Sequence, residues 1–564
     1  YRRGELVRPV KQLVFYIDSL MPVKWNPYIK AGAESWNKAF EKIGFKDVIC
    51  VKEFPKNDTL FNANSFDCMT IRYSASWLNS AQTTIHSDTR TGEILNASIL
   101  INANMISVQY ADRIGATVAI DPRVRTTVFP QEIQGELIQA AIAQAVGTGL
   151  GLTMNWGASC AYPVDSLRSA SFTQKYGLAS SVMGGVIIND VATEEDVRNG
   201  VCLVNTKPGP YDELVIKYLY QPIYASSLQE EKETLDSWIR EHTGDPYYAY
   251  IRNQSRFDSD PRNSRGSLGD DHLKSFDYML PNVRKGFENY YSWFAKEDRD
   301  FLMRRRVHSA LSERLSGRIY AILSYIGGIY LNDIREKDAI PSYSMVDREK
   351  QKAALSKALE LAKNLDWVDD TAHLNEFEIS DKKADRLRLD IFNGIFGRLP
   401  YVEVCTERFP DAAYTASEYL DDIYGIVWEG VLKHRPLENF DRALQTAFLE
   451  SIISTSTATA PIGSFKASKT GFAATGKPEI NLAALRNGGK VDMKMYSLQN
   501  AEEVAGFSSI PPIYTNQTKI AAYYFDLLMR TKDMLKKAIS TAPEADRSHY
   551  DLLIYRINKA TEIE

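Results

Sequence analysis

The stretch 130–155, PQEIQGELIQAAIAQAVGTGLGLTMN, decides how the first half of this sequence is interpreted. Pro130 suits a first helical position, and Glu132 and Glu136 suit the positive end of a helix dipole. Apolar residues then recur at helical spacing as far as Val146. The stretch therefore predicts a long helix that ends in a glycine-rich turn at Gly147, Gly149 and Gly151.

The residues before this helix predict a sheet with helices packed on it. Short runs rich in β-forming residues predict strands at 12–17, 47–53, 68–73 and 92–102. An amphipathic stretch from Asn26 to about Ile43 predicts a helix that Gly44 ends. Strands that alternate with helices indicate an α/β domain, which we place at residues 1–205.

The rest of the chain predicts a different architecture. Residues 206–275 are predicted to be a loop-rich connecting segment, because 243–272 are rich in Asp, Arg, Asn, Ser and Gly. Helical patterns dominate from 276 to 564. A stretch rich in Ser, Thr, Ala and Gly predicts a flexible insertion near 454–492. The predicted fold class is thus an α/β domain followed by a largely α-helical C-terminal region.

Composition narrows the classes of function. The 564 residues carry 67 Lys and Arg against 72 Asp and Glu, a net charge of −5. This balance argues against a nucleic-acid partner, which would need a basic footprint. No apolar run approaches the roughly 20 residues of a membrane helix, so we expect no transmembrane segment. The five cysteines are scattered and form no CxxC pair, so a disulfide framework is not expected.

The segment Ala143–Asn155 has the spacing of a zinc-protease helix without its chemistry. Such a helix uses HExxH because positions i and i+4 lie on one face and reach one ion. The segment resembles the helix AHEVGHTLGLRHN of a bacterial zinc-dependent metalloprotease family with a metzincin-type (zincin) catalytic domain. The shared residues are Ala143, Val146, Gly147, Leu150, Gly151, Leu152 and Asn155.

Further blocks support the resemblance, which spans residues 10 to about 370. Ser181–Gly184 stands where the family has its Met-turn, so Met183 is expected to form the floor beneath the zinc position. Other matching blocks are Val14–Asp18, Gly92–Leu95, Asn155–Leu167, Gly269–Asp271 and Tyr325–Asp333. The resemblance implies a metzincin-like fold for the α/β domain.

The same alignment shows that this chain lacks the side chains that the family uses to bind zinc and to activate water. The three ligand positions and the general-base position are degenerate, occupied by Gln144, Thr148, Met154 and Ala145 respectively. A neutral amide, a hydroxyl and a thioether are poor Zn²⁺ ligands, and alanine cannot act as a base. We therefore predict no metal and no cofactor, although the family implies zinc, and no catalytic residue.

Other candidate sites are weaker. None of the seven histidines pairs with another as HxxxH, and Cys160 has no base beside it in the sequence. An acidic loop between Asp258 and Asp271 could hold Ca²⁺. Pro261 and Arg262 break the EF-hand pattern, so we favour a solvated loop with a helix-capping Asp, and the question of a structural Ca²⁺ stays open.

The family resemblance also implies where a peptide would bind. Metzincin-type proteases hold substrate against an exposed edge strand, a mode that does not depend on zinc. We expect this strand at about 94–102, with Ile94, Asn96, Ser98 and Leu100 as its peptide-binding residues. The leading hypothesis is an inactive homologue, a pseudoprotease, that binds a peptide or protein or serves as a scaffold.

Two alternatives remain beside it. One is an active zinc metalloendopeptidase with an unconventional site, and the other is a subunit of a cell-envelope assembly. By resemblance alone, the location is expected to be exported, either periplasmic or outer-membrane-associated. The chain begins at Tyr1 rather than Met, so we expect an upstream portion to be missing.

Overall fold

The computed structural model describes residues 4–78, 81–251, 259–263, 267–336, 338–373, 382–456 and 517–561. The predicted insertion near 454–492 lies outside these residues except for 454–456. The chain forms two compact units, Tyr1–Tyr419 and Leu420–Glu564. The predicted domain boundaries at residues 205 and 275 stay predictions.

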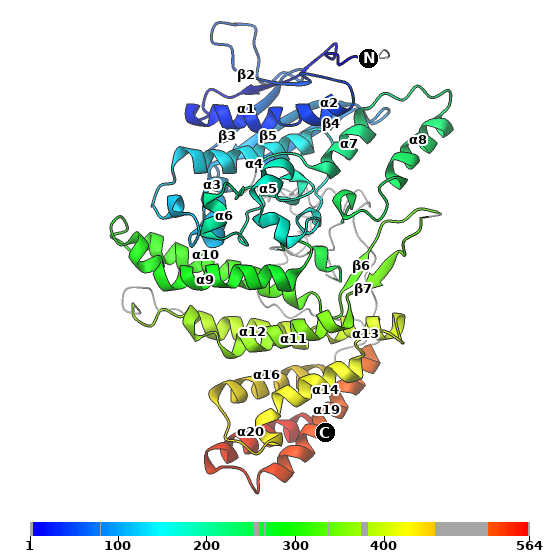
Figure 1. The fold of residues 1–564 in the computed structure, drawn as a ribbon. Coiled ribbons are helices and arrows are strands. Elements are labelled where there is room, and N and C mark those ends of the chain that lie inside the picture. Colours follow the sequence, from blue (N-terminus) through cyan, green and yellow to red (C-terminus); the bar gives the residue numbers. More distant parts are fainter. Residues whose placement is uncertain are drawn as a thin grey trace, which may run out of the picture. The chain divides into compact units, whose positions relative to one another are not determined.

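A five-stranded sheet lies at the N-terminal end of the first unit (Figure 1). Its strands are β1 (Leu13–Ile17), β2 (Ile49–Glu53), β3 (Met69–Ser74), β4 (Ala81–Ser87) and β5 (Ile94–Asn102), in the order β2-β1-β3-β5-β4. All pairings are parallel except β4 with β5, where Thr83 faces Ile99. The four strands predicted from apolar runs are confirmed, and β4 is an addition that the sequence pattern missed.

Helices α1 (Asn26–Glu34) and α4 (Gln131–Gly149) share one hydrophobic core with the sheet. The two helices lie close together, because a Cβ on Gly32 would stand only 2.5 Å from the Gln139 carbonyl oxygen. Trp36 is fully buried and its indole N–H donates to the Ala143 carbonyl at 2.8 Å. The expected helix over 26–43 is interrupted at Ser35 and Trp36, and α2 (Asn37–Lys42) continues it.

Five further helices occupy residues 103–240: α3 (Ala103–Thr117), α5 (Ala170–Tyr176), α6 (Glu194–Arg198), α7 (Pro210–Tyr220) and α8 (Leu228–Arg240). Two of them, α7 and α8, lie inside the segment that was predicted to be loop-rich. The sequence analysis missed these helices because the loop prediction rested on the polar composition of 243–272, which follows both helices, and because Gly and Pro residues near 208–210 are typical of loops.

The remainder of the first unit is mainly helical, as predicted. It contains α9 (His272–Phe294), α10 (Leu302–Leu323), α11 (Arg348–Lys363), α12 (Lys383–Phe396), α13 (Leu399–Arg408) and the hairpin β6 (Ile329–Leu331) with β7 (Tyr343–Met345). Asp190 ties the residues after α5 to α10, because its buried carboxylate accepts hydrogen bonds from Arg314 at 2.6 Å and Arg318 at 2.9 Å.

The second unit is entirely helical in its described residues. Helix α14 (Ala416–Val427) begins in the first unit and ends in the second. It is followed by α15 (Glu429–Leu432), α16 (Asn439–Ser456), α19 (Gln517–Ala538) and α20 (Glu544–Thr561). Trp428, Phe448 and Leu528 lie in the core of this unit.

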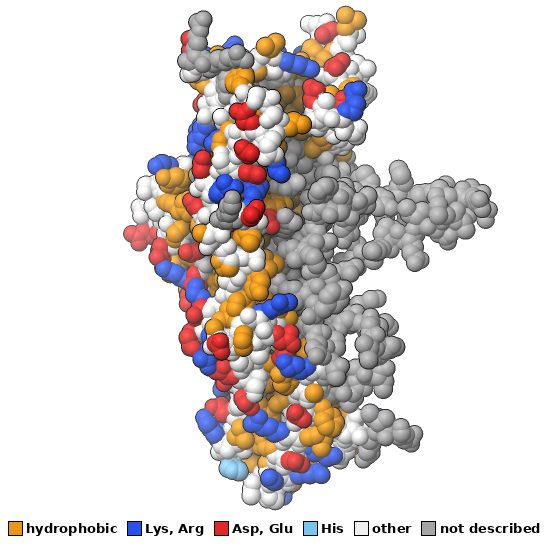
Figure 2. Space-filling model, turned by 90° about the vertical axis from the view of Figure 1, so that its right-hand side faces the viewer, with side chains coloured by type: hydrophobic (Ala, Val, Ile, Leu, Met, Phe, Trp, Pro, Cys, Tyr) orange, Lys and Arg blue, Asp and Glu red, His pale blue; other side chains and the backbone are white. Residues whose placement is uncertain are grey.

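Two surface properties bear on the choice of partner. Among the described residues, no helix combines the length and the apolar character needed to cross a bilayer. On the side chains drawn in Figure 2, acidic and basic groups are interspersed with hydrophobic ones instead of gathering by sign. The absence of a nucleic-acid partner stays a prediction.

Candidate functional site: the end of helix α4 and the Met-turn

The C-terminal half of α4 carries the residues that the sequence singled out. Between residues 140 and 150, only Gln144 and Thr148 are partly exposed, and all the other side chains are buried. The two residues are four positions apart and so share one helix face. This face, which would present the first two zinc ligands in an active protease helix, is the only one that α4 leaves partly open there.

The turn after α4 brings the third position back to the first. Gly151 has a φ of +93°, a left-handed conformation that reverses the chain after the helix. Met154 then lies beside Gln144, with the amide nitrogen 3.1 Å from the thioether sulfur. The Thr148 hydroxyl donates to the Gln144 carbonyl oxygen at 3.4 Å. The structure thus brings residues 144, 148 and 154 to one place.

Ala145 occupies the position of the catalytic glutamate and lies in a different environment. Its side chain is buried, and its carbonyl oxygen accepts a hydrogen bond from the Thr83 hydroxyl at 3.0 Å. This bond joins α4 to strand β4. The alanine therefore contributes packing and a carbonyl group, and it has no side-chain atom that could accept a proton.

The segment Ser181–Gly184 forms the floor beneath this site. Met183 is fully buried in the short 3-10 turn Val182–Gly184, and its carbonyl oxygen accepts the Asn155 N–H at 3.0 Å. A Cβ on Gly147 would lie 2.6 Å from Met183 Sδ and 2.5 Å from the Trp36 ring. Only glycine at 147 allows this methionine to approach the helix so closely.

A helix that ends beside a turn with a buried methionine is the arrangement that the resemblance to a metzincin-type domain led us to expect. The sequence pattern of the family described as Met-zincin matches residues 126–435, which include α4, the turn and most of the following helices. The chain belongs to the Met-zincin family. No curated protein and no solved structure gives a significant match.

The residues at the Met-zincin zinc position do not fit zinc. Zinc sites in proteins use thiolate, imidazole or carboxylate donors, whereas this position offers an amide, a hydroxyl and a thioether. The Gln144 amide and the Met154 sulfur also contact each other directly instead of flanking a space for an ion. Among the described residues, no group of three or more His, Cys, Asp or Glu side chains could hold a metal.

Asp212 holds the Met-turn in place, and sequence analysis missed it. Its Oδ2 accepts the N–H groups of Val182 and Gly209, both at 2.9 Å, and its Oδ1 lies 2.5 Å from Ser181 Oγ. Burial raises the pKa of Asp212 to about 7, although these hydrogen bonds oppose the shift. The available signal was local: Gly209-Pro210 followed by an Asp at the third helical position predicts a helix start.

The prediction that residues 94–102 form an exposed, peptide-binding edge strand was wrong. Strand β5 is an interior strand, because it pairs with β4 along most of its length and with β3 from Ile99 to Asn102. Asn96 is buried and donates its amide to the Phe66 and Cys68 carbonyl groups, which leaves it unavailable to a ligand. The other residues of the prediction, Ile94, Ser98 and Leu100, lie on the same interior strand.

Strand β4 is the outer strand on this side of the sheet. Within the described residues it pairs with β5 alone. The side chains of Thr84, His86 and Ser87 are exposed, and Thr83 links the strand to α4 as described above. The open edge beside the degenerate site is therefore provided by 81–87, a strand whose polar sequence gave little signal.

The described carboxylates of the predicted acidic loop each make a separate structural contact. Asp258 lies outside the described residues. Asp260 is buried against the Arg262 guanidinium, so it is not the solvated group that we expected. Asp271 caps α9, as predicted, by accepting the N–H groups of Leu273 and Lys274. Asp270 accepts the Val164 N–H at 3.1 Å, so the three described carboxylates face different partners.

Proposed function

We propose that this chain is an inactive Met-zincin that binds an extended peptide or protein segment without cleaving it. The observation that carries the proposal is the direct contact between Gln144 and Met154, which places two non-ligands against each other at the zinc position. Ala145 supplies no base for activating water. The site keeps the architecture of a protease and lacks its acid–base chemistry.

The edge of β4 supports peptide binding. An outer strand presents unpaired backbone N–H and C=O groups, and an extended peptide can add to it as a further strand. The exposed side chains of Thr84 and His86 would lie beside such a peptide, with the Phe66 ring tilted against His86 at a centroid distance of 5.6 Å. Backbone pairing would provide affinity, and these side chains would provide selectivity.

Gln144 gives the bound peptide a neutral neighbour in place of an ion. Its amide group can both donate and accept hydrogen bonds, and it is only partly buried. It can therefore bind a peptide carbonyl or N–H group that passes over α4. It cannot transfer a proton at neutral pH, so binding would end in release of the intact peptide.

The biological setting belongs to the same proposal. A scaffold role in a bacterial envelope assembly, with an exported location that is periplasmic or outer-membrane-associated, is supported by the family resemblance alone. A peptide-binding cleft is compatible with such a role, because the partner would be another protein of the assembly.

Two measurements on the purified chain test the proposal. We expect elemental analysis to find well below one zinc per chain, and a fluorogenic peptide library to remain uncut with or without EDTA. One equivalent of zinc together with EDTA-sensitive cleavage would establish the active alternative and refute the proposal.

Binding is tested with the peptides themselves. Peptides selected from a library by fluorescence anisotropy are resynthesised with single N-methyl groups at each position in turn. We expect loss of binding when alternate amides are methylated and little effect at the positions between them, because a strand presents alternate N–H groups to its neighbour. A uniform response along the peptide would contradict binding at the edge of β4.

A further inference from the structure

The segment 246–251 is fastened to the residues that follow the zinc position. The buried side chain of Asn155 donates to the Ala249 carbonyl oxygen at 2.9 Å and accepts the Ile251 N–H at 3.1 Å. The Ile251 carbonyl oxygen in turn accepts the Trp156 N–H at 3.3 Å. These three hydrogen bonds fix the segment directly after the third degenerate ligand position.

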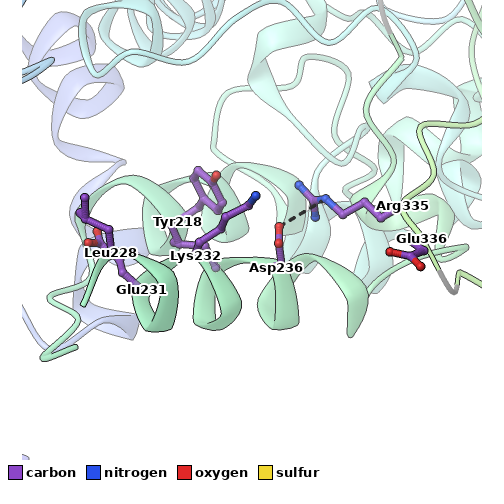
Figure 3. A pocket seen from close by; sticks show the side chains of 8 residues that line it. Tyr218, Leu228, Glu231, Lys232, Asp236, Arg335 and Glu336 are labelled. Atoms are coloured by element: carbon purple, nitrogen blue, oxygen red, sulfur yellow. Dashed lines mark ion pairs between the residues drawn. The ribbon is translucent and has the colours of Figure 1, made fainter. Parts of the chain in front are cut away.

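The helix that leads into this segment is held by polar contacts. No side chain of α8 is buried, so a hydrophobic core does not fix its position. The Lys217 ammonium of α7 lies 4.5 Å from the centre of the Trp238 ring of α8. Asp236 Oδ1 lies 3.5 Å from Arg335 Nε, which belongs to the chain that follows β6 (Figure 3). The segment after α8 is therefore anchored on both of its sides.

Tyr250 brings a hydroxyl group from this segment to the zinc position. Its ring stacks on the Tyr211 ring with nearly parallel planes and a centroid distance of 6.1 Å. Its hydroxyl oxygen lies 3.2 Å from Thr153 Oγ1. Thr153 precedes Met154, whose sulfur contacts the Gln144 amide. The hydroxyl pair of Thr153 and Tyr250 therefore lies one residue away from the contact at the zinc position.

The hydroxyl pair and strand β4 lie on different sides of the open face of α4. Strand β4 approaches the helix at Ala145, through the Thr83 hydroxyl. The hydroxyl pair approaches at Gln144, through the neighbouring Met154. Consecutive residues of an α-helix point about 100° apart. The partly open face of Gln144 and Thr148 therefore has β4 along one side and the hydroxyl pair along the other.

The hydroxyl pair keeps one O–H group free for a ligand. A single hydrogen bond joins the two hydroxyls, and either oxygen can be its donor. In the part of the chain that the structure describes, neither hydroxyl makes another hydrogen bond. Whichever hydroxyl donates within the pair, the other keeps a proton that an outside acceptor can receive. Thr153 is exposed and Tyr250 is half-buried, so a main-chain carbonyl group of an extended peptide can reach this proton.

The two outer strands of the sheet differ in how their edges are protected. On β2, the Asn37 side chain donates to the Ile49 carbonyl oxygen and accepts its N–H, and Glu34 accepts the Val51 N–H at 3.1 Å. The outer side of β4 has no such partner within the described ranges. Its sequence, AQTTIHS, also contains neither Lys nor Pro, the residues that commonly protect an edge. The chain therefore leaves the edge of β4 open and closes the edge of β2.

We propose that a peptide on β4 is bound from both sides, with one of its carbonyl groups accepting a hydrogen bond from the hydroxyl pair. This inference rests on the proposed binding of a peptide at the edge of β4. The N–H and C=O groups of one strand residue point to the same side, and those of its neighbours point to the other side. The carbonyl group that faces the hydroxyl pair therefore belongs to a residue whose own N–H points away from β4.

The second wall also limits the kind of partner. The hydroxyl pair occupies the side on which a further strand would pair with the bound one. The partner is therefore a single extended segment, such as a loop or a chain end, and not the edge of another sheet.

The first test compares variants of the hydroxyl pair by fluorescence anisotropy. The probe is the labelled peptide that the wild-type chain binds most tightly in a random library. Thr153→Val and Tyr250→Phe each leave one hydroxyl that can still donate, so each should weaken binding by less than about twofold. The double variant removes both protons and should weaken binding about fivefold, the value of one neutral hydrogen bond. Tyr555→Phe combined with Thr561→Val, on α20, is the matched control and should bind as wild type does.

Replacing single carbonyl oxygens of the peptide by sulfur tests whether the hydroxyl pair contacts a carbonyl group directly. A thioamide keeps the shape of the amide, and its sulfur is a poorer hydrogen-bond acceptor. In the double variant, one position should lose the sensitivity to sulfur that it has in wild type, and its residue should tolerate N-methylation. Carbonyl groups that pair with β4 should stay sensitive in both proteins. An unchanged thioamide pattern in the double variant would show a merely structural role and would overturn the proposal.

The outcomes separate this inference from the proposed function. If wild type binds peptides with the alternating N-methyl pattern and the double variant binds them equally well, this inference is refuted and peptide binding at β4 stands. If wild type selects no peptide, or if binding responds uniformly to methylation, the proposed function is refuted and this inference with it.

Discussion

Replacing Asp212 tests whether the Met-turn is held by one buried carboxyl group. Asp212→Ala removes the acceptor of the Val182 and Gly209 N–H groups and the partner of Ser181 Oγ. Asp212→Asn keeps an oxygen for both N–H groups and places an amide donor opposite Ser181. The two variants therefore separate the loss of hydrogen bonds from the loss of a titratable group.

The expected magnitudes follow from the number of groups left without partners. A buried donor that loses its acceptor costs about 1–3 kcal/mol, and the alanine variant leaves two backbone donors in this state. We expect Asp212→Ala to lower the free energy of unfolding by about 3–5 kcal/mol at pH 5. Asp212→Asn imitates the protonated carboxyl group and should cost no more than about 1 kcal/mol there.

The pH dependence has a defined sign. The pKa of Asp212 is about 7 in the folded chain, against 3.8 for an unperturbed Asp. The folded state therefore keeps a proton that the unfolded state releases, and the resulting stability is complete below pH 4 and lost as the pH rises to 7. At about 1.4 kcal/mol for each pKa unit, wild type should lose up to about 4 kcal/mol relative to Asp212→Asn across this window.

Urea unfolding followed by circular dichroism, at half-unit steps from pH 4 to 8, measures both effects. Wild type and the two variants are compared at every pH, so that other titrating groups cancel in the differences. Parallel curves for wild type and Asp212→Asn would refute the raised pKa. A cost below about 1 kcal/mol for Asp212→Ala at pH 5 would refute the role of this carboxyl group in holding the Met-turn.

Three further predictions concern the first unit, and one of them has its control variant in the second. Restoring the zinc motif with Q144H, A145E, T148H and M154H should create a site that takes up one zinc per chain in elemental analysis, whereas wild type should not. If the folded variant took up no zinc, the four positions would not converge on one ion. Gly147→Ala should destabilise by about 1–3 kcal/mol in urea unfolding, because its Cβ would clash with the Met-turn, while Gly425→Ala, with open space around it, should be neutral or stabilising by up to about 1 kcal/mol. Asp190→Ala should cost about 3–5 kcal/mol by leaving two guanidinium groups without their shared carboxylate, and a cost near zero would contradict the buried ion pair.

Local patterns predicted much of the first unit. The helix of residues 131–149 and four of the five strands follow from apolar periodicity, which depends on neighbours along the chain. Strand β4 was missed because Ala81–Ser87 is polar and lacks clear alternation. Its strand conformation depends on pairing with β5 across the sheet, which no local window contains.

The edge-strand error has the same origin. The resemblance indicated that a peptide-binding strand should exist, but the order of strands within a sheet is a property of the whole fold. The apolar sequence of 94–102 is typical of an interior strand, and that reading would have placed β5 between two neighbours.

The sequence by itself determined which residues occupy the zinc-ligand and general-base positions, because the identities of residues 144, 145, 148 and 154 and their helical spacing are local properties. Only the tertiary structure decided how these residues are arranged. The contact of Met154 with Gln144 depends on the turn at Gly151, and the open edge at β4 depends on strand order. The hydrogen bonds of Asp212 with Val182 and Ser181 join residues 30 and 31 positions apart in the sequence, and the ion pair of Arg335 with Asp236 joins residues still further apart. Such contacts form because folding buries side chains against residues that are distant in the sequence, and a local sequence pattern does not identify those residues.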